Sequence, residues 1–280
     1  DTAAHTVALF GQTVPVSSIV IGVIVSAIVT LVLFGGIKRI GAVAEKLVPV
    51  MAAVYILASL LVVGSNIGSL GKIFAMIFRG AFSAEAALGG AFGITIMTTI
   101  QKGVGRGVFS NEAGLGSAPI AAAAAKTNEP ARQGLVCMTG TFIDTIVICF
   151  MTGLVIVLSG AWKPELGLTG VNITIEAFNR GFSFLGGCGD TVASLLIAVS
   201  LSFFAFTTIL GWNYYSEKCL EYLIGTGRRK PLIMFRICYT AMVFAGPYLT
   251  VSAVWGIADI MNGLMAFPNL VALVLLSPEV

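Results

Sequence analysis

A polar, glycine-rich stretch interrupts the middle of this largely apolar sequence. Residues 105–125 read GRGVFSNEAGLGSAPIAAAAA, with one arginine, one asparagine, one glutamate, two serines and four glycines ahead of an alanine run. Glycine lets a backbone unwind and approach a ligand closely. In hydrocarbon every backbone polar group needs a partner, so an unwound segment is tolerated only where it lines a cavity or is buried in protein. The stretch therefore predicts a small-molecule and ion site inside a membrane protein.

The unwound backbone offers ligand groups of both signs. Freed N–H groups and the start of a resuming helix attract an anion such as a carboxylate, and freed carbonyls bind a cation such as sodium. Pro119 suits the first turn of the resuming helix, and we expect Ser117 to cap it. The alternative is an ordinary cytoplasmic loop. A dinucleotide loop fits less well, because Val108 stands where GxGxxG needs glycine and no βαβ pattern surrounds it.

Composition places the chain among integral membrane proteins. It is 57% hydrophobic and 10% charged, with a mean hydropathy of +0.98, whereas a soluble domain carries about a quarter charged residues. The net charge of +3 shows no nucleic-acid footprint. The single histidine is His5, so neither a Ser-His-Asp set nor a His-rich metal site can be assembled. We interpret the chain as a piece of a longer membrane protein.

Seven segments are long and apolar enough to cross a bilayer, which takes about 20 residues. Six are uninterrupted: 14–35, 47–64, 134–160, 190–215, 232–254 and 257–276. The seventh lies within 86–126, whose 41 residues are about twice one span, and it predicts two half-helices with an irregular joint. The stretches 66–83 and 163–187 are more polar and predict surface helices.

Lysine and arginine predict the orientation, because cytoplasmic loops carry an excess of both. Loops 36–46, 126–132 and 216–236 fall on one side if the segment 86–126 crosses once. Together they hold ten of the sixteen basic residues, and the opposite loops hold four. We therefore expect these three loops to be cytoplasmic in a multi-pass protein of the cell membrane.

The long motifs resemble the alanine or glycine:cation symporter family, which are sodium-coupled carriers of small neutral amino acids. The resemblance covers nearly the whole chain. It rests on the stretch 105–125, followed by Gln133-Gly134, and on TGTFIDTIVICFMTGLVI (139–156), FGGIKRIGAVAEKLVP (34–49), FFAFTTILGWNYYSEK (203–218) and VWGIADIMNGLMAFPNL (254–270).

The resemblance implies an all-α integral membrane protein with the LeuT-type fold. That fold has two inverted repeats of five helices, and the first helix of each repeat is broken at the substrate site. By order, the seven spans look like helices four to ten, so helices one to three would lie outside this chain. Asn111 to Ser117 resembles the G-x-G-N-x-x-G stretch of the family's first broken helix with opposite topology, as inverted repeats require.

The joint is the predicted substrate site. Its backbone and side-chain polar groups would bind the carboxylate and amine of the amino acid, and a small pocket would favour alanine or glycine. The residues expected to supply these polar groups are Phe109, Ser110, Asn111, Gly114 and Ser117. Asn111 and Ser117 have a simpler alternative, because such side chains often bond only the nearby backbone. Trp212 would wall the pocket or, alternatively, sit in the interfacial aromatic belt.

The resemblance also implies a sodium site. The family fold holds a sodium ion between its first and eighth helices, with two adjacent hydroxyl residues on the eighth. Thr207 and Thr208 occupy that position, and Phe204 would add its carbonyl oxygen; oxygen ligands suit a hard cation. The alternative is that both threonines bond their own i−4 carbonyls. The remaining ligands would lie outside this chain.

Two carboxylates fall in or near the predicted site. Asp144 lies well inside a span, where a charge is costly and by default functional. We expect it to accept hydrogen bonds from the joint and hold its shape. Glu112 is likewise expected to stabilise the joint, because a neutral amino acid and one sodium ion need no second carboxylate.

These residues predict a secondary transporter that imports alanine or glycine with co-transported sodium, by alternating access and without enzymatic chemistry. A proton-coupled carrier would instead use Asp144 or Glu112 as a relay. A channel would show unsaturable flux, and an intramembrane enzyme would need a nucleophile and base. The expected partners are the amino acid and the lipid bilayer, with no nucleic acid. Oligomeric state cannot be read from the sequence.

Overall fold

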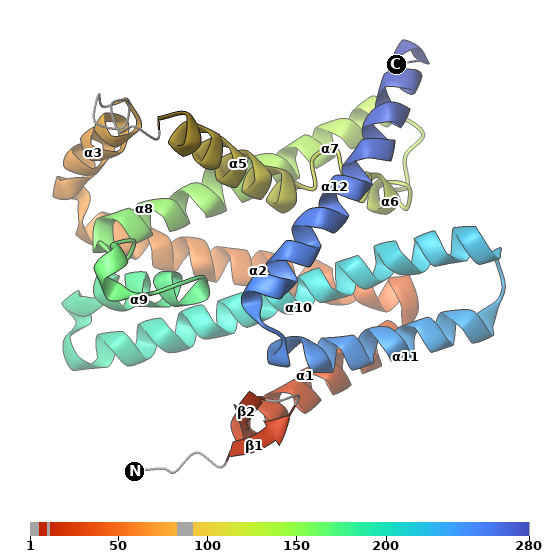
Figure 1. The fold of residues 1–280 in the computed structure, drawn as a ribbon, viewed down its shortest axis with the longest axis horizontal. Coiled ribbons are helices and arrows are strands. Elements are labelled where there is room, and N and C mark those ends of the chain that lie inside the picture. Colours follow the sequence, from red (N-terminus) through yellow and green to blue (C-terminus); the bar gives the residue numbers. More distant parts are fainter. Residues whose placement is uncertain (1–5, 10–11, 83–91, 280) are drawn as a thin grey trace. The chain divides into compact units, whose positions relative to one another are not determined.

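The computed structural model describes residues 6–9, 12–82 and 92–279 (Figure 1). Most of these residues are helical, with turns between the helices. The chain also has one short antiparallel hairpin, β1 (Thr6–Leu9) and β2 (Gln12–Pro15), in which Val7 pairs with Val14. The hairpin was not predicted. The all-α membrane fold class is otherwise confirmed; the LeuT-type arrangement stays a prediction.

The helices follow one another with short connections. The α-helices are α1 (Val16–Leu33), α2 (Gly36–Ser65), α3 (Leu70–Phe82), α5 (Phe92–Asn111), α6 (Ala118–Ala122), α7 (Pro130–Phe142), α8 (Phe150–Ser159), α9 (Val171–Gly181), α10 (Gly189–Ile224), α11 (Arg229–Ala245) and α12 (Val251–Leu276). The π-helix η2 (Ile143–Cys149) joins α7 to α8. Single 3-10 segments are η1 (Ile67–Ser69), η3 (Pro164–Leu166), η4 (Ser183–Cys188), η5 (Gly246–Tyr248) and η6 (Ser277–Glu279).

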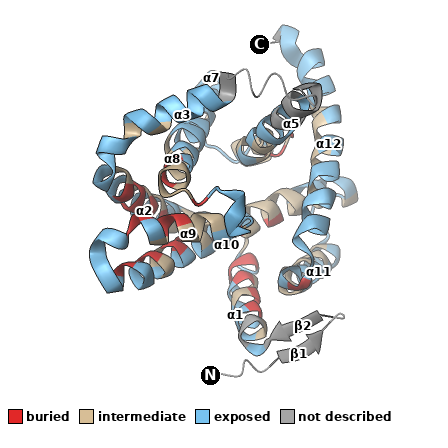
Figure 2. Ribbon diagram, turned by 60° about the vertical axis from the view of Figure 1, so that its left-hand side comes forward, coloured by how far each residue is buried: buried red, intermediate tan, exposed pale blue. Residues whose placement is uncertain are grey.

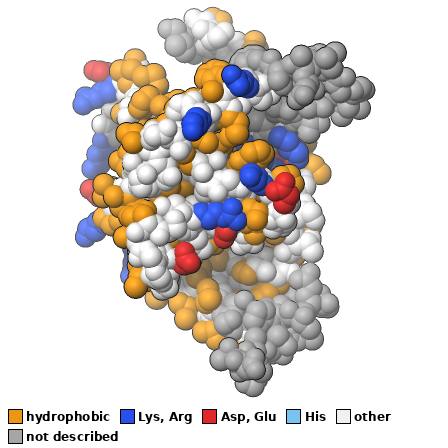
Figure 3. Space-filling view, turned by 90° about the vertical axis from the view of Figure 1, so that its left-hand side faces the viewer, with side chains coloured by type: hydrophobic (Ala, Val, Ile, Leu, Met, Phe, Trp, Pro, Cys, Tyr) orange, Lys and Arg blue, Asp and Glu red, His pale blue; other side chains and the backbone are white. Residues whose placement is uncertain are grey.

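Four helical stretches in the described part of the chain are long and apolar enough to cross a membrane: Lys38–Ser65, Pro130–Ser159, Ser183–Ile224 and Val251–Leu276. A shorter apolar helix covers Ile19–Leu33. Many large apolar side chains are exposed, and the face in Figure 3 shows apolar side chains with charged ones scattered among them. Such a surface is stable against lipid and not against water. The exact set of seven spans stays a prediction.

Two of the predicted loops are largely helical. The segment 36–46 forms the start of α2, and α10 and α11 leave only residues 225–228 between them, so most of 216–236 is helix. Charged side chains tolerate the helical state well, and the 36 residues of α10 extend about 54 Å at 1.5 Å per residue. A helix of that length projects beyond a hydrocarbon core of about 30 Å. The charges therefore mark helix ends rather than loops.

The boundary between the last two predicted spans is also displaced. The helix α11 ends at Ala245 rather than at residue 254, and α12 starts at Val251 rather than at 257. Pro247 lacks a backbone N–H and cannot continue α11 as a regular helix. The residues after this break are also apolar, so hydropathy alone could not locate it.

The segment 86–126 is broken, as its length suggested. The helix α5 ends at Asn111 and a short helix, α6, resumes at Ala118, while residues 86–91 lie outside the described residues. The second half is shorter than expected, because α6 has only 5 residues. The stretches predicted as surface helices contain α3 and α9; their place relative to a membrane stays a prediction.

Contacts divide the chain into two compact units. The first unit holds residues 1–49, 115–124 and 203–280, and the second holds 50–114 and 125–202. Within the first unit α1 lies beside α11, and buried Val29, Leu33 and Leu210 form its core. Within the second unit α8 packs on α9, and the fully buried Phe178 ring lies 5.6 Å from the Tyr55 ring. Figure 2 shows these cores as the buried parts of α1, α2, α9 and α10.

The helices α10 and α11 are held together by polar contacts in the first unit. Arg236 donates to both carboxylate oxygens of Glu217, at 2.5 and 2.9 Å. The Arg236 guanidinium also lies 6.0 Å from the centre of the Phe34 ring. One α-helical turn along α11, the Tyr239 hydroxyl donates to the Ile209 carbonyl at 2.8 Å. These contacts fix the second half of α10, which carries most of the candidate site.

We predict that Glu217→Gln lowers the stability of this hairpin. Both side chains of the Glu217–Arg236 pair are only 17% exposed, so the substitution leaves a half-buried guanidinium without its carboxylate, at a cost of about 1–2 kcal/mol. The apparent melting temperature in detergent should fall by several degrees. Glu221→Gln is the matched control, since Glu221 pairs with the exposed Lys218. Equal melting temperatures for the two variants would contradict the prediction.

Candidate functional site

The joint between α5 and α6 has an irregular backbone. The φ angles are 50° at Glu112, 74° at Gly114 and 80° at Gly116. Glycine adopts this left-handed region freely, whereas it costs another residue about 1–2 kcal/mol. Glu112 is the one non-glycine residue with positive φ in the described part of the chain. Gly105 and Gly107, which we also expected to unwind, remain inside α5.

Ser117 occupies the position before α6 but does not cap it. Its own φ and ψ of −77° and −46° are helical, and its side chain makes no capping bond to the first turn. A capping side chain needs an extended backbone at its own position, so the expected cap is wrong. Pro119 does lie in the first turn, as predicted. The Ser117 side chain is instead buried, at 1% exposed.

Two polar contacts tie the end of α5 to η2 within the second unit. The Ser110 hydroxyl donates to Asp144 Oδ2 at 2.5 Å, and Asn111 Nδ2 donates to Thr145 Oγ1 at 2.8 Å. Asn111 also bonds the Gly107 carbonyl at 3.1 Å. Consecutive residues of one segment thus bond consecutive residues of the other. Asp144 therefore contacts the last turn of α5, next to the joint, and its supporting role stays a prediction.

The π-helix was not predicted from the sequence. In η2 the backbone hydrogen bonds join residues five apart instead of four, which interrupts the regular α-helical pattern. Such segments are frequent at functional sites. Asp144 and Thr145 lie in η2, facing Ser110 and Asn111. Thr145 was missed as well, although its place directly after Asp144 was a usable signal.

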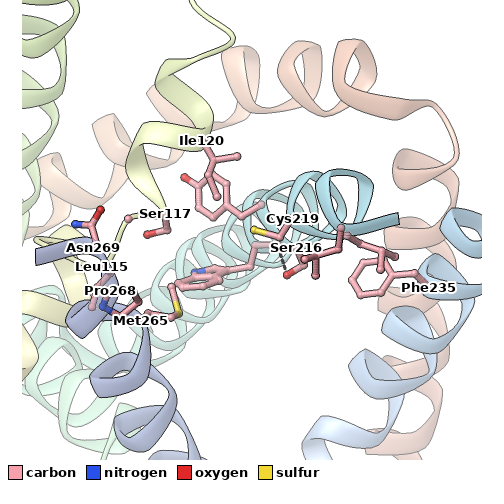
Figure 4. Close-up of a pocket in the computed structure, with 14 residues that line it drawn as sticks. Leu115, Ser117, Ile120, Ser216, Cys219, Phe235, Met265, Pro268 and Asn269 are labelled. Atoms are coloured by element: carbon pink, nitrogen blue, oxygen red, sulfur yellow. Dashed lines mark hydrogen bonds between the residues drawn. The ribbon is translucent and has the colours of Figure 1, made fainter. Parts of the chain in front are cut away.

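A pocket of 590 Å³ opens within the first unit (Figure 4). The largest group of lining residues lies on one face of α10, where they recur every three or four positions or lie side by side, as a helix face requires. These α10 residues are Trp212, Tyr215, Ser216, Cys219, Leu220 and Leu223. Ligand pockets commonly measure about 300–1,000 Å³, so the volume is ample for an amino acid.

The remaining wall of the pocket comes from the joint, from α12, and from Ile120 of α6 and Phe235 of α11. Leu115, Gly116 and Ser117 line it on one side, and Pro268 and Asn269 on another. Trp212 and Ser117, both predicted substrate residues, therefore border one cavity. The wall is mostly apolar, and the Ser216 hydroxyl is occupied by a hydrogen bond to the Trp212 carbonyl at 2.8 Å. Asn269 was missed by the sequence reasoning, although its motif was noted.

The other predicted substrate residues lie in the second unit. Phe109, Asn111 and Gly114 are half-buried there, and Ser110 is exposed. Their contacts are local to that unit, as described above for Ser110 and Asn111.

The predicted sodium residues lie along α10. The Thr207 hydroxyl is 3.0 Å from both the Phe203 and Phe204 carbonyls, and the Thr208 hydroxyl donates to Phe204 at 2.8 Å. The alternative noted from the sequence, hydroxyl bonding to the same helix, is therefore present. Each hydroxyl oxygen retains lone pairs, so these bonds leave both oxygens able to accept a cation. The Phe204 carbonyl is the more crowded of the predicted ligands.

A sequence model described as the sodium:alanine symporter family matches residues 2–280. This chain belongs to the sodium:alanine symporter family. The match includes the joint, η2, α10 and α12, so one family model covers all the features described above. The description of this family is one of transporters rather than of enzymes.

Individual relatives agree with the family assignment. The chain is 50% identical over 257 residues to an uncharacterized transporter of Haemophilus influenzae, covering 91% of this chain and 54% of that protein. It is 47% identical over 264 residues to the sodium/alanine symporter AgcS of Methanococcus maripaludis, covering 94% and 55%. It is 33% identical over 274 residues to a sodium/proton-dependent alanine carrier protein of Bacillus sp. strain PS3, covering 95% and 61%. The chain thus spans little more than half the length of these relatives.

We predict that Gly116→Ala disrupts the joint. A Cβ atom at Gly116 would lie 3.0 Å from Asn269 Oδ1 and 3.2 Å from its Cγ, on a backbone with φ of 80°. Left-handed strain and the close contact together should cost about 2–3 kcal/mol. The measurement is the apparent melting temperature. Gly107→Ala is the matched control, because a Cβ there meets nothing within 4 Å and alanine favours a helix. The prediction fails if the two substitutions have the same effect.

Proposed function

We propose that the whole protein imports alanine or glycine together with sodium, as a secondary active transporter working by alternating access. The observation that carries the proposal is the pocket next to the glycine joint, in a chain of the sodium:alanine symporter family. In this proposal the protein has the LeuT-type inverted-repeat fold, and the present chain supplies helices four to ten. It lies in the cell membrane.

The pocket is long enough to hold a small amino acid at one end and to leave a release path at the other. Its α10 face runs from Trp212 to Leu223, about 16 Å at 1.5 Å per residue, which is longer than alanine. The far end points along α10 toward the connection 225–228 and the basic residues Arg228, Arg229 and Lys230. Basic connections face the cytoplasm. We therefore assign the joint end to substrate binding and the remainder to release into the cytoplasm.

The polar groups at the joint suit a zwitterion. They are backbone amides, hydroxyls, the Asn111 carboxamide and the Glu112 carboxylate, which has an interaction partner of its own. The nearby Asp144 carboxylate already accepts a hydrogen bond from Ser110. A zwitterion needs one donor set and one acceptor set, which backbone and side-chain dipoles supply without a net charge. Phe109, Ser110, Asn111, Gly114, Ser117 and Trp212 are the proposed substrate residues.

Sodium is the proposed co-substrate, held by Thr207 and Thr208 hydroxyl oxygens and the Phe204 carbonyl. Three oxygen atoms from one helix leave half of an octahedral set open, and the other ligands would come from the first helix, outside this chain. Sodium bound there would stabilise the state that accepts substrate, because a ligand shifts a conformational equilibrium by its differential affinity.

Proton coupling is the second candidate. The relative from Bacillus sp. strain PS3 is named a sodium/proton-dependent alanine carrier, and Asp144 lies among membrane-span helices, where a carboxylate is able to relay a proton. Its bond to Ser110 links that carboxylate to the proposed substrate site. Protonation of Asp144 would therefore change the hydrogen bonding of a proposed substrate residue.

We predict that alanine uptake by the complete parent protein requires a sodium gradient, and that Thr208→Ala raises the sodium concentration for half-maximal uptake by about tenfold or more. The reason is the loss of one oxygen ligand, worth about 1.5–3 kcal/mol for a bond to a charge. The measurement is uptake of labelled alanine in proteoliposomes over a range of sodium concentrations.

The matched control is Ser202→Ala, on the same helix. The Ser202 hydroxyl donates to the Ala198 carbonyl at 2.7 Å, as Thr208 does to Phe204, so this variant removes an equivalent hydroxyl from outside the proposed ion site. An unchanged sodium requirement in Thr208→Ala would contradict the ion site. Uptake driven by a proton gradient alone, and abolished in Asp144→Asn, would replace the sodium proposal with proton coupling.

A further inference from the structure

The helix α12 contributes a polar side chain to the substrate pocket. Along α12 only one stripe is half-buried, and every other residue of the helix is exposed. The stripe consists of Ala258, Asn262, Met265, Ala266 and Asn269. Its positions repeat every three or four residues, as one helix face requires. At the end of this stripe, Asn269 reaches the joint.

Asn269 lies against the joint backbone. Its Oδ1, Cγ and Cβ atoms are the atoms nearest to the position of a Cβ on Gly116, at 3.0, 3.2 and 3.3 Å. Only a glycine at position 116 permits this approach at unchanged geometry. Figure 4 shows Asn269 and Ser117 on neighbouring parts of the pocket wall, coming from α12 and from the joint.

The Asn269 carboxamide makes no hydrogen bond to any residue that the structure describes. Most of the surrounding pocket wall is apolar, including Leu115, Met265 and Pro268. A carboxamide supplies two N–H donors and a carbonyl acceptor, which match the carboxylate and the ammonium group of an amino-acid zwitterion. A few placed polar groups in an apolar pocket are what fixes the orientation of a small ligand.

We propose that Asn269 is a further substrate-binding residue, whose carboxamide bonds the charged main-chain end of the amino acid beside Gly116. This rests on the proposed function of the pocket. The contact comes from α12, so it also couples the position of that helix to substrate binding. Because every α-amino acid shares this end, Asn269 contributes affinity equally to alanine, glycine and serine.

The test compares Asn269→Leu and Asn269→Asp with wild type in the complete parent protein. Both variants keep the approximate size of the side chain, and each removes the amide donors. We expect the KM for alanine to rise about tenfold to a hundredfold, the loss typical of a hydrogen bond to a charged group. The same factor should apply to glycine and serine, and the sodium requirement at saturating alanine should stay unchanged.

Asn262 provides the matched control. It is half-buried on the same stripe of α12 but does not line the pocket, so Asn262→Leu should leave the KM unchanged. An Asn269→Leu variant with wild-type KM would overturn the inference. So would factors that differ between alanine, glycine and serine, or a fall in melting temperature and maximal rate at constant KM, which would indicate a structural role.

A second measurement separates this inference from the proposed function. Thermal stabilisation of the detergent-purified protein is recorded with each of the twenty amino acids. If an amino acid stabilises the wild type but not Asn269→Leu, the inference stands even where sodium-driven uptake of alanine fails. If no amino acid stabilises the wild type, both the inference and the proposed function are contradicted.

Discussion

The need to bond every backbone polar group in a membrane governs the architecture of this site. An interruption in a helix is expensive in hydrocarbon and survives only where other groups cover the freed N–H and C=O groups. Here the interruption is confined to residues 112–117, between the last residue of α5 and the first of α6. Positive φ at Glu112, Gly114 and Gly116 turns the chain within that short distance.

The polar surroundings of the joint follow from the same constraint. On the α5 side, Ser110 and Asn111 bond Asp144 and Thr145 of η2, itself an interruption of the regular ladder. On the α6 side, Ser117 is buried and Gly116 lies against Asn269. Backbone that is held by such contacts loses less conformational entropy when a ligand binds.

The helix α10 serves several purposes because its faces differ. Leu210 packs into the core with α1, and Glu217 bonds Arg236 of α11. Another face, from Trp212 to Leu223, lines the pocket. The predicted ion ligands Thr207 and Thr208 lie one turn before Trp212. A shift of α10 would therefore change the geometry of the pocket and of the proposed sodium site together. Coupling between two ligands requires such a shared element.

The sequence alone determined the membrane class, the family and the position of the broken helix, because hydropathy, long motifs and a polar glycine run are local properties. It also singled out Ser117, Trp212 and Asp144. Only the tertiary structure showed that Ser117 does not cap α6, that residues 36–46 are helical and that α11 ends at Ala245. The pairing of Asn111 with Thr145 and the approach of Asn269 to Gly116 were likewise invisible, since contacts between distant segments depend on packing and leave no periodic trace in the chain.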